Sequence, residues 1–352
     1  MISHKTHKNL NHFLLRFCMS VLLVQWPIGA QALTPIMLDG HYVAAEGEGW
    51  KFTARLLITK KDNFLSTCTA VLVHKRVLLT AAHCLKEIAG ITVFLGDDPN
   101  SLNKQSPTKG ASYSTNELTY KTHPKYVGVK KPQPEGPAPK TQVGFASTYF
   151  GEVQTTQLAA GRDPFVDENG QFIFQSENYE FFREVYKKSF DEETHPMLSF
   201  EKSLPATRRA DIALIVLKDE VPEPFSPITI WDQQPELALK FGDELYTFGY
   251  GFHTLSTSNH DEALRFSNLN LVGLIGEPGA AQQIVGFALD TRGPMRGDSG
   301  GPVAIKRDDQ FFLVGLNSAA GYDGHAMAAV PQTFLPWIKQ MVVVLSAGEV
   351  SL

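Results

Sequence analysis

The chain has 352 residues, of which 43% are hydrophobic and 20% are charged. That balance suits a folded protein with one or two packed cores and excludes a disordered chain. Lys and Arg number 32 against 37 Asp and Glu, a net charge of −5 that argues against nucleic acid as the main partner. The only long apolar stretch lies near the N-terminus and is too short to span a bilayer, so we expect no membrane span.

Residues 1–32 have the layout of a signal peptide. A charged start precedes a short apolar core at 17–24, and the small residues Ala30 and Ala32 mark a cleavage site. The basic residues of the start are Lys5, Lys8 and Arg16. We therefore expect a mature chain of residues 33–352 that is secreted or periplasmic. The alternative is a buried N-terminal helix.

Apolar or alternating runs follow one another along the rest of the chain and predict strands, many of them separated by Gly, Pro, Asn or Asp. They are Phe52–Ile58, Thr69–His74, Val77–Thr80, Ile91–Leu95, Ile212–Leu217, Glu244–Tyr250, Ile284–Leu289, Pro302–Ile305 and Phe311–Leu316. The last segment, from about Pro336 to Leu345, has a helical pattern, and a proline is tolerated in its first turn. Many short strands with one terminal helix predict an all-β sandwich or barrel.

Cysteine usage agrees with export. Cys18 leaves with the predicted signal peptide, so the exported chain keeps Cys68 and Cys84. An even pair in an exported protein is most simply one disulfide. It would close a loop of about 16 residues and stabilise the fold by roughly 3 kcal/mol, because it lowers the entropy of the unfolded chain. Two cysteines cannot make a structural zinc site and no HExxH cluster appears, so we expect no metal and no cofactor.

The stretch 128–204 interrupts the pattern of strands. Residues 128–148 are rich in Lys, Pro and Gly and have the composition of an exposed connection. Residues 149–200 carry 11 of the 37 aromatic residues, a density that argues for packing. Within them, Asn178–Phe190 can form a helix.

The sequence Gly-Asp-Ser-Gly-Gly-Pro at 297–302 is the most informative in the chain. A serine hydroxyl is a poor nucleophile until a base removes its proton. Glycines beside Ser299 let the backbone turn tightly and expose N–H groups that can bind the oxyanion of a tetrahedral intermediate. Upstream, His83 can act as the base, and Asp211 can orient that histidine. Each residue alone is more often structural, but the order His, Asp, Ser makes the set specific.

Three motifs in this order resemble those of the trypsin/chymotrypsin-like serine proteases. They are Thr-Ala-Ala-His-Cys at 80–84, Asp-Ile-Ala-Leu at 211–214 and Gly-Asp-Ser-Gly-Gly-Pro at 297–302. Weaker similarities lie at 246–251, 314–318 and 337–338. The resemblance covers about 36–126 and 205–345 but not 128–204.

The resemblance implies an all-β, chymotrypsin-like fold of two six-stranded antiparallel β-barrels with a C-terminal helix and a large insertion. It places the first barrel in 33–127 and 205–225, the insertion in 128–204, and the second barrel with the C-terminal helix in 226–352. The family has a much shorter connection in place of 128–204. We expect the insertion either to limit substrate access or bind a regulatory partner at the rim of the cleft, or to be a surface elaboration without function.

The resemblance also implies an exported serine endopeptidase that cleaves peptide bonds of protein or peptide substrates through an acyl-enzyme. Ser299 would be the nucleophile, His83 the general base and then acid, and Asp211 the residue that orients His83. The N–H groups of Gly297 and Ser299 would form the oxyanion hole. The pair Cys68–Cys84 would be the family's disulfide beside the catalytic histidine.

Substrate preference would depend on the residue six positions before the nucleophile, which in this family lies at the floor of the pocket. Here it is Gly293, which offers no charge to a cationic side chain. We therefore expect cleavage after uncharged residues. The walls of the pocket would come from Pro294, Ser318, Ala319 and Ala320.

Two departures from the family concern the pocket and activation. The family usually has a cysteine four positions before the nucleophile, but Met295 stands here and the partner cysteine is absent too, so the pocket lacks its usual disulfide. In the family, a new N-terminus freed by proteolysis pairs with the Asp before the nucleophile, here Asp298. The nearest matching stretch, 36–40, has no Arg or Lys just before it, so trypsin-like activation is not evident. Alternatively, Asp298 is a turn residue that binds local N–H groups.

Two other functions fit parts of the sequence. Residues 297–301 also satisfy the G-x-S-x-G pattern of α/β-hydrolase esterases. That fold needs a histidine after the serine, where only His325 stands, and a helix where 302–305 predicts a strand. The second alternative is a catalytically silent, protease-like module for binding or adhesion. The complete set of three residues and the presence of Gly297 argue against it.

Overall fold

The computed structural model describes these residues of the chain: 41–42, 48–96, 110–126, 183–184, 186–187, 200–201, 210–251, 264–277, 280–289, 293–320 and 324–352. The predicted signal peptide at 1–32, the stretch 36–40 and most of 128–204 lie outside them. All described residues belong to one unit, Pro35–Leu352.

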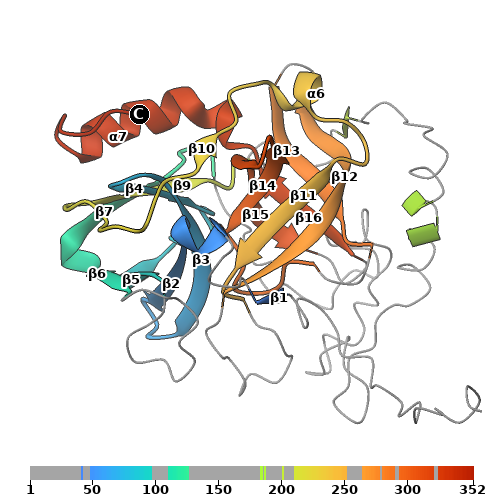
Figure 1. The fold of residues 1–352 in the computed structure, drawn as a ribbon. Coiled ribbons are helices and arrows are strands. Elements are labelled where there is room, and N and C mark those ends of the chain that lie inside the picture. The colour runs from blue at the N-terminus through green and yellow to red at the C-terminus, as the bar shows by residue number, and fades with distance from the viewer. Residues whose placement is uncertain are drawn as a thin grey trace, which may run out of the picture. The chain divides into compact units, whose positions relative to one another are not determined.

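Six strands from the C-terminal half of the chain close into a β-barrel, coloured yellow to red in Figure 1. The order around the barrel is β12-β11-β14-β15-β16-β13, and β13 pairs again with β12; every pair is antiparallel. The strands are β11 (Glu244–Gly249), β12 (Arg265–Glu277), β13 (Ala280–Phe287), β14 (Pro302–Arg307), β15 (Gln310–Ala320) and β16 (His325–Ala329). Three two-residue strands extend this sheet: β1 (His41–Tyr42), β8 (Phe200–Glu201) and β10 (Thr229–Ile230).

Seven strands form the other sheet, in the order β6-β5-β2-β3-β4-β9-β7, again with every pair antiparallel. The strands are β2 (Thr53–Lys60), β3 (Leu65–His74), β4 (Val77–Thr80), β5 (Ile88–Leu95), β6 (Ala111–Ser114), β7 (Leu118–Thr122) and β9 (Ala213–Leu217). Strand β9 comes from far along the chain, so this sheet joins segments on either side of 128–204.

Strands β6 and β7 are two halves of one bent strand. The short helix η2 (Thr115–Glu117) joins them directly, and the Ser114 N–H donates to Glu117 Oε2 at 2.7 Å across the bend. Because β6 pairs with β5 and β7 pairs with β9, the chain itself closes the ring at the bend. Counted in this way the first barrel also has six strands, and the predicted fold of two antiparallel six-stranded barrels with a C-terminal helix is confirmed.

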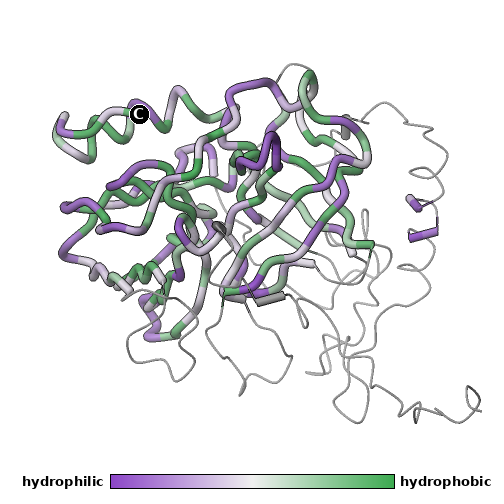
Figure 2. The backbone as a smooth tube through the Cα atoms, in the orientation of Figure 1, coloured by the Kyte–Doolittle hydropathy of each residue, from purple (hydrophilic) through white to green (hydrophobic). Residues whose placement is uncertain are grey.

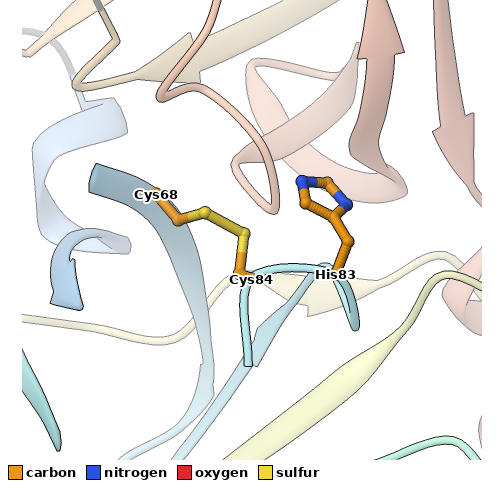
Figure 3. Close-up of side chains that lie close together, drawn as sticks. All are labelled: Cys68, His83 and Cys84. Carbon is orange, nitrogen blue, oxygen red and sulfur yellow. A yellow bond between two sulfur atoms is a disulfide. The ribbon is translucent and has the colours of Figure 1, made fainter. Parts of the chain in front are cut away.

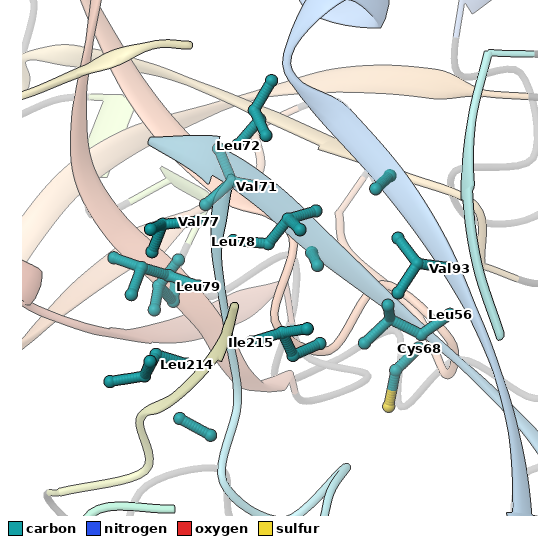
Figure 4. Close-up of a cluster of buried hydrophobic side chains, with 14 of the residues drawn as sticks. Leu56, Cys68, Val71, Leu72, Val77, Leu78, Leu79, Val93, Leu214 and Ile215 are labelled. Carbon is teal, nitrogen blue, oxygen red and sulfur yellow. The ribbon is translucent and has the colours of Figure 1, made fainter. Parts of the chain in front are cut away.

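The core of the first barrel is made by strands that are apolar along their whole length. Every residue of β4 and β9 is buried, which explains their continuous apolar sequences. Figure 4 shows Leu78 and Leu79 of β4 beside Leu214 and Ile215 of β9. Figure 2 shows hydrophobic residues recurring along the strands of both barrels. A rigid core of this kind fixes the ends of β4 and β9, where candidate catalytic residues lie.

The C-terminal helix α7 (Leu335–Leu345) ties the two barrels together (Figure 1). It follows the second barrel in sequence, yet its buried residues Ile338 and Val342 belong to the same hydrophobic cluster as β4 and β9. His123, just after β7, packs edge-on against Trp337, with ring centroids 4.7 Å apart. Within the described residues, no helix is long and apolar enough to cross a membrane.

All nine predicted strands overlap observed strands, and the predicted terminal helix overlaps α7. The strands that were not predicted are β6, β7, β12 and β16 and the two-residue strands β1, β8 and β10. The remaining short helices are η1 (Glu48–Lys51), α6 (Pro235–Ala238) and η3 (Pro331–Phe334). Residues 183–184 and 186–187 are helical and fall inside the predicted helix 178–190, most of which lies outside the described residues.

Candidate active site

Strands β4 and β9 bring His83 and Asp211 together. The two strands pair antiparallel with Thr80 opposite Ala213, so the turn after β4 and the residues before β9 lie at the same edge of the sheet. His83 Nδ1 is 2.7 Å from Asp211 Oδ2, and the His83 backbone N–H donates to Asp211 Oδ1 at 2.9 Å. Because both carboxylate oxygens bind the same residue, the imidazole ring is fixed in orientation as well as in position.

A further hydrogen bond on Asp211 comes from the second barrel. Ser318 Oγ, on β15, donates to Asp211 Oδ2 at 2.6 Å. The sequence suggested Ser318 only as a wall of the pocket, and no local pattern around it indicates this second contact. The carboxylate is 5% exposed as a result, whereas the His83 side chain is 34% exposed. The acid is therefore enclosed while the histidine side chain stays partly exposed.

The ion pair sets the pKa values of both groups. Burial on its own would raise the pKa of Asp211, but the charge of His83 and the hydrogen bonds from His83 and Ser318 hold it below its usual value. Burial would lower the pKa of His83, and the nearby Lys60 would too, yet the charge and hydrogen bond of Asp211 raise it above the usual value. A histidine with a raised pKa is a stronger base toward a hydroxyl group.

Ser299 lies in a turn before β14 that is fastened to the first barrel. The Thr69 N–H, on β3, donates to the Ser299 carbonyl at 2.8 Å, and Thr69 Oγ1 donates to the Gly297 carbonyl at 2.9 Å. Gly300 has a φ of 81°, and a Cβ there would come within 2.0 Å of Thr80 Oγ1 and 2.4 Å of the Thr69 carbonyl. Only glycine lets the turn approach the first barrel this closely. Sequence reasoning missed Thr69, because nothing local distinguishes it from other strand threonines.

The serine turn approaches the segment that carries the histidine, but the serine hydroxyl makes no hydrogen bond to that histidine. The Ser299 carbonyl lies 3.6 Å from Sγ of Cys84, the residue next to His83. Within the described residues, no hydrogen bond joins the Ser299 hydroxyl to His83 Nε2. Such contacts are often long before substrate binds and shorten in the complex.

Two backbone N–H groups of the serine turn are available to a ligand. Those of Gly297 and Ser299 donate no hydrogen bond within the described part of the chain. Four neighbouring N–H groups do donate hydrogen bonds within the protein: those of Met295, Asp298, Gly300 and Gly301. Gly297 has a φ of 101°, in the region that favours glycine. Paired donors beside a serine are the arrangement that binds an oxyanion.

A pocket of about 180 Å³ adjoins Ser299. It is lined by Pro294, Met295, Arg296, Ser299, Asn317, Ser318, Ala319 and Ala320. Met295, Arg296 and Asn317 were not expected there, whereas Gly293, the expected floor, is not among the lining residues. The lining includes one arginine and no carboxylate among the described residues. No carboxylate of the described lining residues is therefore present to pair with a cationic side chain.

The predicted disulfide Cys68–Cys84 is present, with an S–S distance of 2.03 Å and a sequence separation of 16. Figure 3 shows it close to His83, which precedes Cys84 in the chain. Ligand atoms of the two cysteines and the histidine all lie within 4.8 Å of one another, as in a metal site. Sulfur atoms joined in a disulfide are not thiolates, so this cluster cannot bind zinc while it is oxidised.

Asp298 is completely buried beneath the serine turn. Its Oδ2 accepts the Met295 N–H and its Oδ1 accepts the Gly251 N–H, each at 2.7 Å. A Cβ at Gly249 would lie 1.9 Å from Oδ1, so a glycine is required where β11 passes the carboxylate. Burial raises the pKa of Asp298 to about 7, against the opposing effects of the two N–H groups and of Arg265. The Met295 contact is local to the turn, as in the turn role that the sequence offered as an alternative, whereas residues 33–40 lie outside the described residues and pairing with a new N-terminus stays untested.

Comparisons with known proteins bear on the family of the chain. The family model described as Trypsin matches residues 40–132 and 180–338. Among curated proteins, no sequence matches the chain. The solved structures similar to it include one titled "HL collagenase structure at 1.7A resolution", which is 17% identical in sequence with a TM-score of 0.47, over 86% of this chain and 97% of that one. The family match spans more than half of the chain, so the resemblance found in the sequence is confirmed and the protein belongs to the trypsin family.

Proposed function

We propose that this protein is an exported serine endopeptidase that cleaves peptide bonds through an acyl-enzyme. The observation that carries the proposal is the His83–Asp211 contact of 2.7 Å beside a serine turn with two unpaired N–H groups. Membership of the trypsin family supports proteolysis in general. The roles of individual residues, the export and the substrate preference are our inferences.

The chemistry follows from the tautomer of His83. Because Nδ1 faces the Asp211 carboxylate, Nδ1 carries the proton and Nε2 remains as the base. As Ser299 Oγ attacks a peptide carbonyl, Nε2 takes the hydroxyl proton and Asp211 stabilises the resulting imidazolium. The N–H groups of Gly297 and Ser299 bind the oxyanion. His83 then gives its proton to the departing amine, and a water activated by His83 releases the acyl group.

The test is labelling with a fluorophosphonate probe, which reacts with an assembled nucleophile, base and oxyanion hole. The purified mature chain should be labelled, and the Ser299→Ala variant should not. Absence of labelling in the folded wild-type chain, also after limited proteolysis near residues 33–40, would instead support the catalytically silent binding module. The α/β-hydrolase alternative is wrong, because residues 302–307 form strand β14 where that fold requires a helix.

The proposed preference is for uncharged residues at the cleaved bond. It rests on a pocket whose described lining residues include Pro294, Ala319 and Ala320 and no carboxylate. A peptide library should show cleavage after uncharged side chains, and dominant cleavage after Arg or Lys would contradict the assignment. Cleavage mainly after Asp or Glu would instead show that Arg296 selects the substrate.

Export through a signal peptide at 1–32 is supported by the disulfide, since disulfides persist in oxidising compartments. We propose the division into a first barrel (33–127 and 205–225), an insertion (128–204) and a second barrel with the C-terminal helix (226–352). N-terminal sequencing of the exported protein should give a start near Leu33. A start at Met1 in protein recovered outside the cytoplasm would contradict the signal peptide.

A further inference from the structure

The two walls of the substrate pocket flank one joint of the second barrel. The segment 293–296, which contains the wall residues 294–296, follows β13, and the wall at 318–320 is the end of β15, just before β16. Where these strands end, Phe287 pairs with His325, and the Ala288 N–H donates to the Gly324 carbonyl at 2.8 Å. A contact that holds this joint therefore acts close in sequence to both walls.

No covalent link holds the walls together. The chain has three cysteines; two of them form the disulfide in the first barrel, and the third, Cys18, lies in the predicted signal peptide. The position four residues before Ser299, where the family usually has a cysteine, is Met295. The walls must be held by packing and hydrogen bonds.

A helical turn from within 128–204 contacts both sides of the joint. Tyr186 Oη is 3.0 Å from His325 Nε2, on the β16 side. The Tyr186 ring packs against the Phe287 ring on the β13 side, with centroids 4.9 Å apart. Arg183 Nε donates to the Leu289 carbonyl at 3.2 Å, five residues before the wall begins at Pro294. One turn thus binds the segment that leads to each wall.

We propose that this turn, residues 183–184 and 186–187, is a brace that positions the substrate pocket, in the place where a disulfide would otherwise hold it. Tyr186 is the central positioning residue, because its ring contacts one strand and its hydroxyl contacts the other. The brace deepens the proposed protease function, since the pocket it holds is the substrate pocket of that enzyme. It gives residues 183–187 a structural effect on specificity.

The primary test is amide hydrogen exchange, which requires no activity. Tyr186→Phe removes only the hydroxyl, and Tyr186→Ala removes the ring as well. Tyr246→Phe is the matched control, because Tyr246 Oη also donates to a side chain of the second barrel, Glu244 at 2.7 Å, away from the pocket. Loss of one hydrogen bond at the joint should speed exchange in both walls by about fivefold in Tyr186→Phe, and by more in Tyr186→Ala.

Amides of β3 in the first barrel should exchange at the wild-type rate in these variants, and the walls should keep their wild-type rate in Tyr246→Phe. The brace is refuted if residues 183–187 lose protection in both Tyr186 variants while 293–296 and 318–320 keep theirs. Should Tyr186→Ala not fold, Tyr186→Phe alone decides.

Kinetics separates the brace from the catalytic assignment. With a peptide amide substrate, Tyr186→Phe should raise KM several-fold and leave the fluorophosphonate labelling rate of Ser299 within about twofold of the wild type, because the probe does not need a formed pocket. Equal losses in labelling and in kcat/KM would mean that the residue acts on the catalytic turn and not on the pocket. If the wild type is not labelled at all, the protease function fails, and the exchange experiment still decides the brace.

Discussion

Replacing Thr69 by valine should weaken the fold and the reaction through the loss of one hydroxyl group. Thr69 Oγ1 donates to the Gly297 carbonyl at 2.9 Å and accepts the Tyr250 N–H at 3.1 Å, and the side chain is fully buried. Valine has nearly the same shape but removes the hydrogen bond that Thr69 makes to each of these two buried backbone groups. At about 1–3 kcal/mol for each such group, the free energy of unfolding should fall by roughly 2–6 kcal/mol.

Thr53→Val provides the matched control, because Thr53 is equally buried and its hydroxyl donates to a single group, the Gly49 carbonyl at 2.7 Å. Urea denaturation should show about half the loss of Thr69→Val. The two variants should differ more in kcat, because the Gly297 carbonyl lies between the two N–H groups proposed to bind the oxyanion. Thr69→Val should lose up to about 10²-fold, comparable to losing one such donor, and Thr53→Val almost nothing. Equal effects of both variants on stability and on kcat would refute the role of Thr69.

Three further variants test the site. Asp211→Asn should lower kcat about 10⁴-fold in steady-state assays, as in related triad proteases, because the amide favours the wrong tautomer of the histidine; a loss below roughly tenfold would exclude the orienting role. Gly297→Ala should slow acylation about 10²-fold or more, whereas Gly348→Ala, at a similar positive φ with nothing within 4 Å, should cost only backbone strain. In Asp298→Asn, stability should depend less on pH: a carboxyl with its pKa raised to about 7 stabilises the fold below pH 4 and loses that contribution as the pH rises to 7. Thermal unfolding from pH 4 to 8 should show wild-type stability falling relative to the variant by at most about 4 kcal/mol, and parallel curves would contradict the shift.

The strands that could be predicted are those whose pattern of apolar residues follows their burial. Strands β4 and β9 are buried on both faces and are continuous apolar runs. Strand β12 was missed because its register shifts between Leu271 and Gly273 against β13, so a period of two is not maintained along it. Strand β16, His-Ala-Met-Ala-Ala, has no β-branched residue; its pairing with β13 and β15 overrides its low strand propensity.

In the candidate site, too, some residues could be predicted from the sequence and others could not. The motifs around His83, Asp211 and Ser299 can be recognised because each is local and carries its own glycine, cysteine or apolar neighbours. The residues that hydrogen-bond to these motifs cannot be recognised from the sequence, because these contacts depend on which strands the two barrels place together. Ser318 reaches Asp211 from β15, and Thr69 reaches the serine turn from β3. Neither contact has a counterpart in sequence spacing.

The serine turn is held from two sides, and this makes the site depend on both barrels at once. The first barrel binds its carbonyls through Thr69, and the Gly251 N–H at the end of β11 in the second binds the carboxylate of Asp298. Neither barrel alone supplies both contacts, so the two N–H groups at Gly297 and Ser299 are aligned only when the barrels are docked. Burying an acid whose pKa rises to about 7 is unfavourable in itself. This unfavourable burial is consistent with a role of Asp298 in fixing the turn. Its two carboxylate oxygens accept the N–H groups of Met295 and Gly251 and so join these two residues.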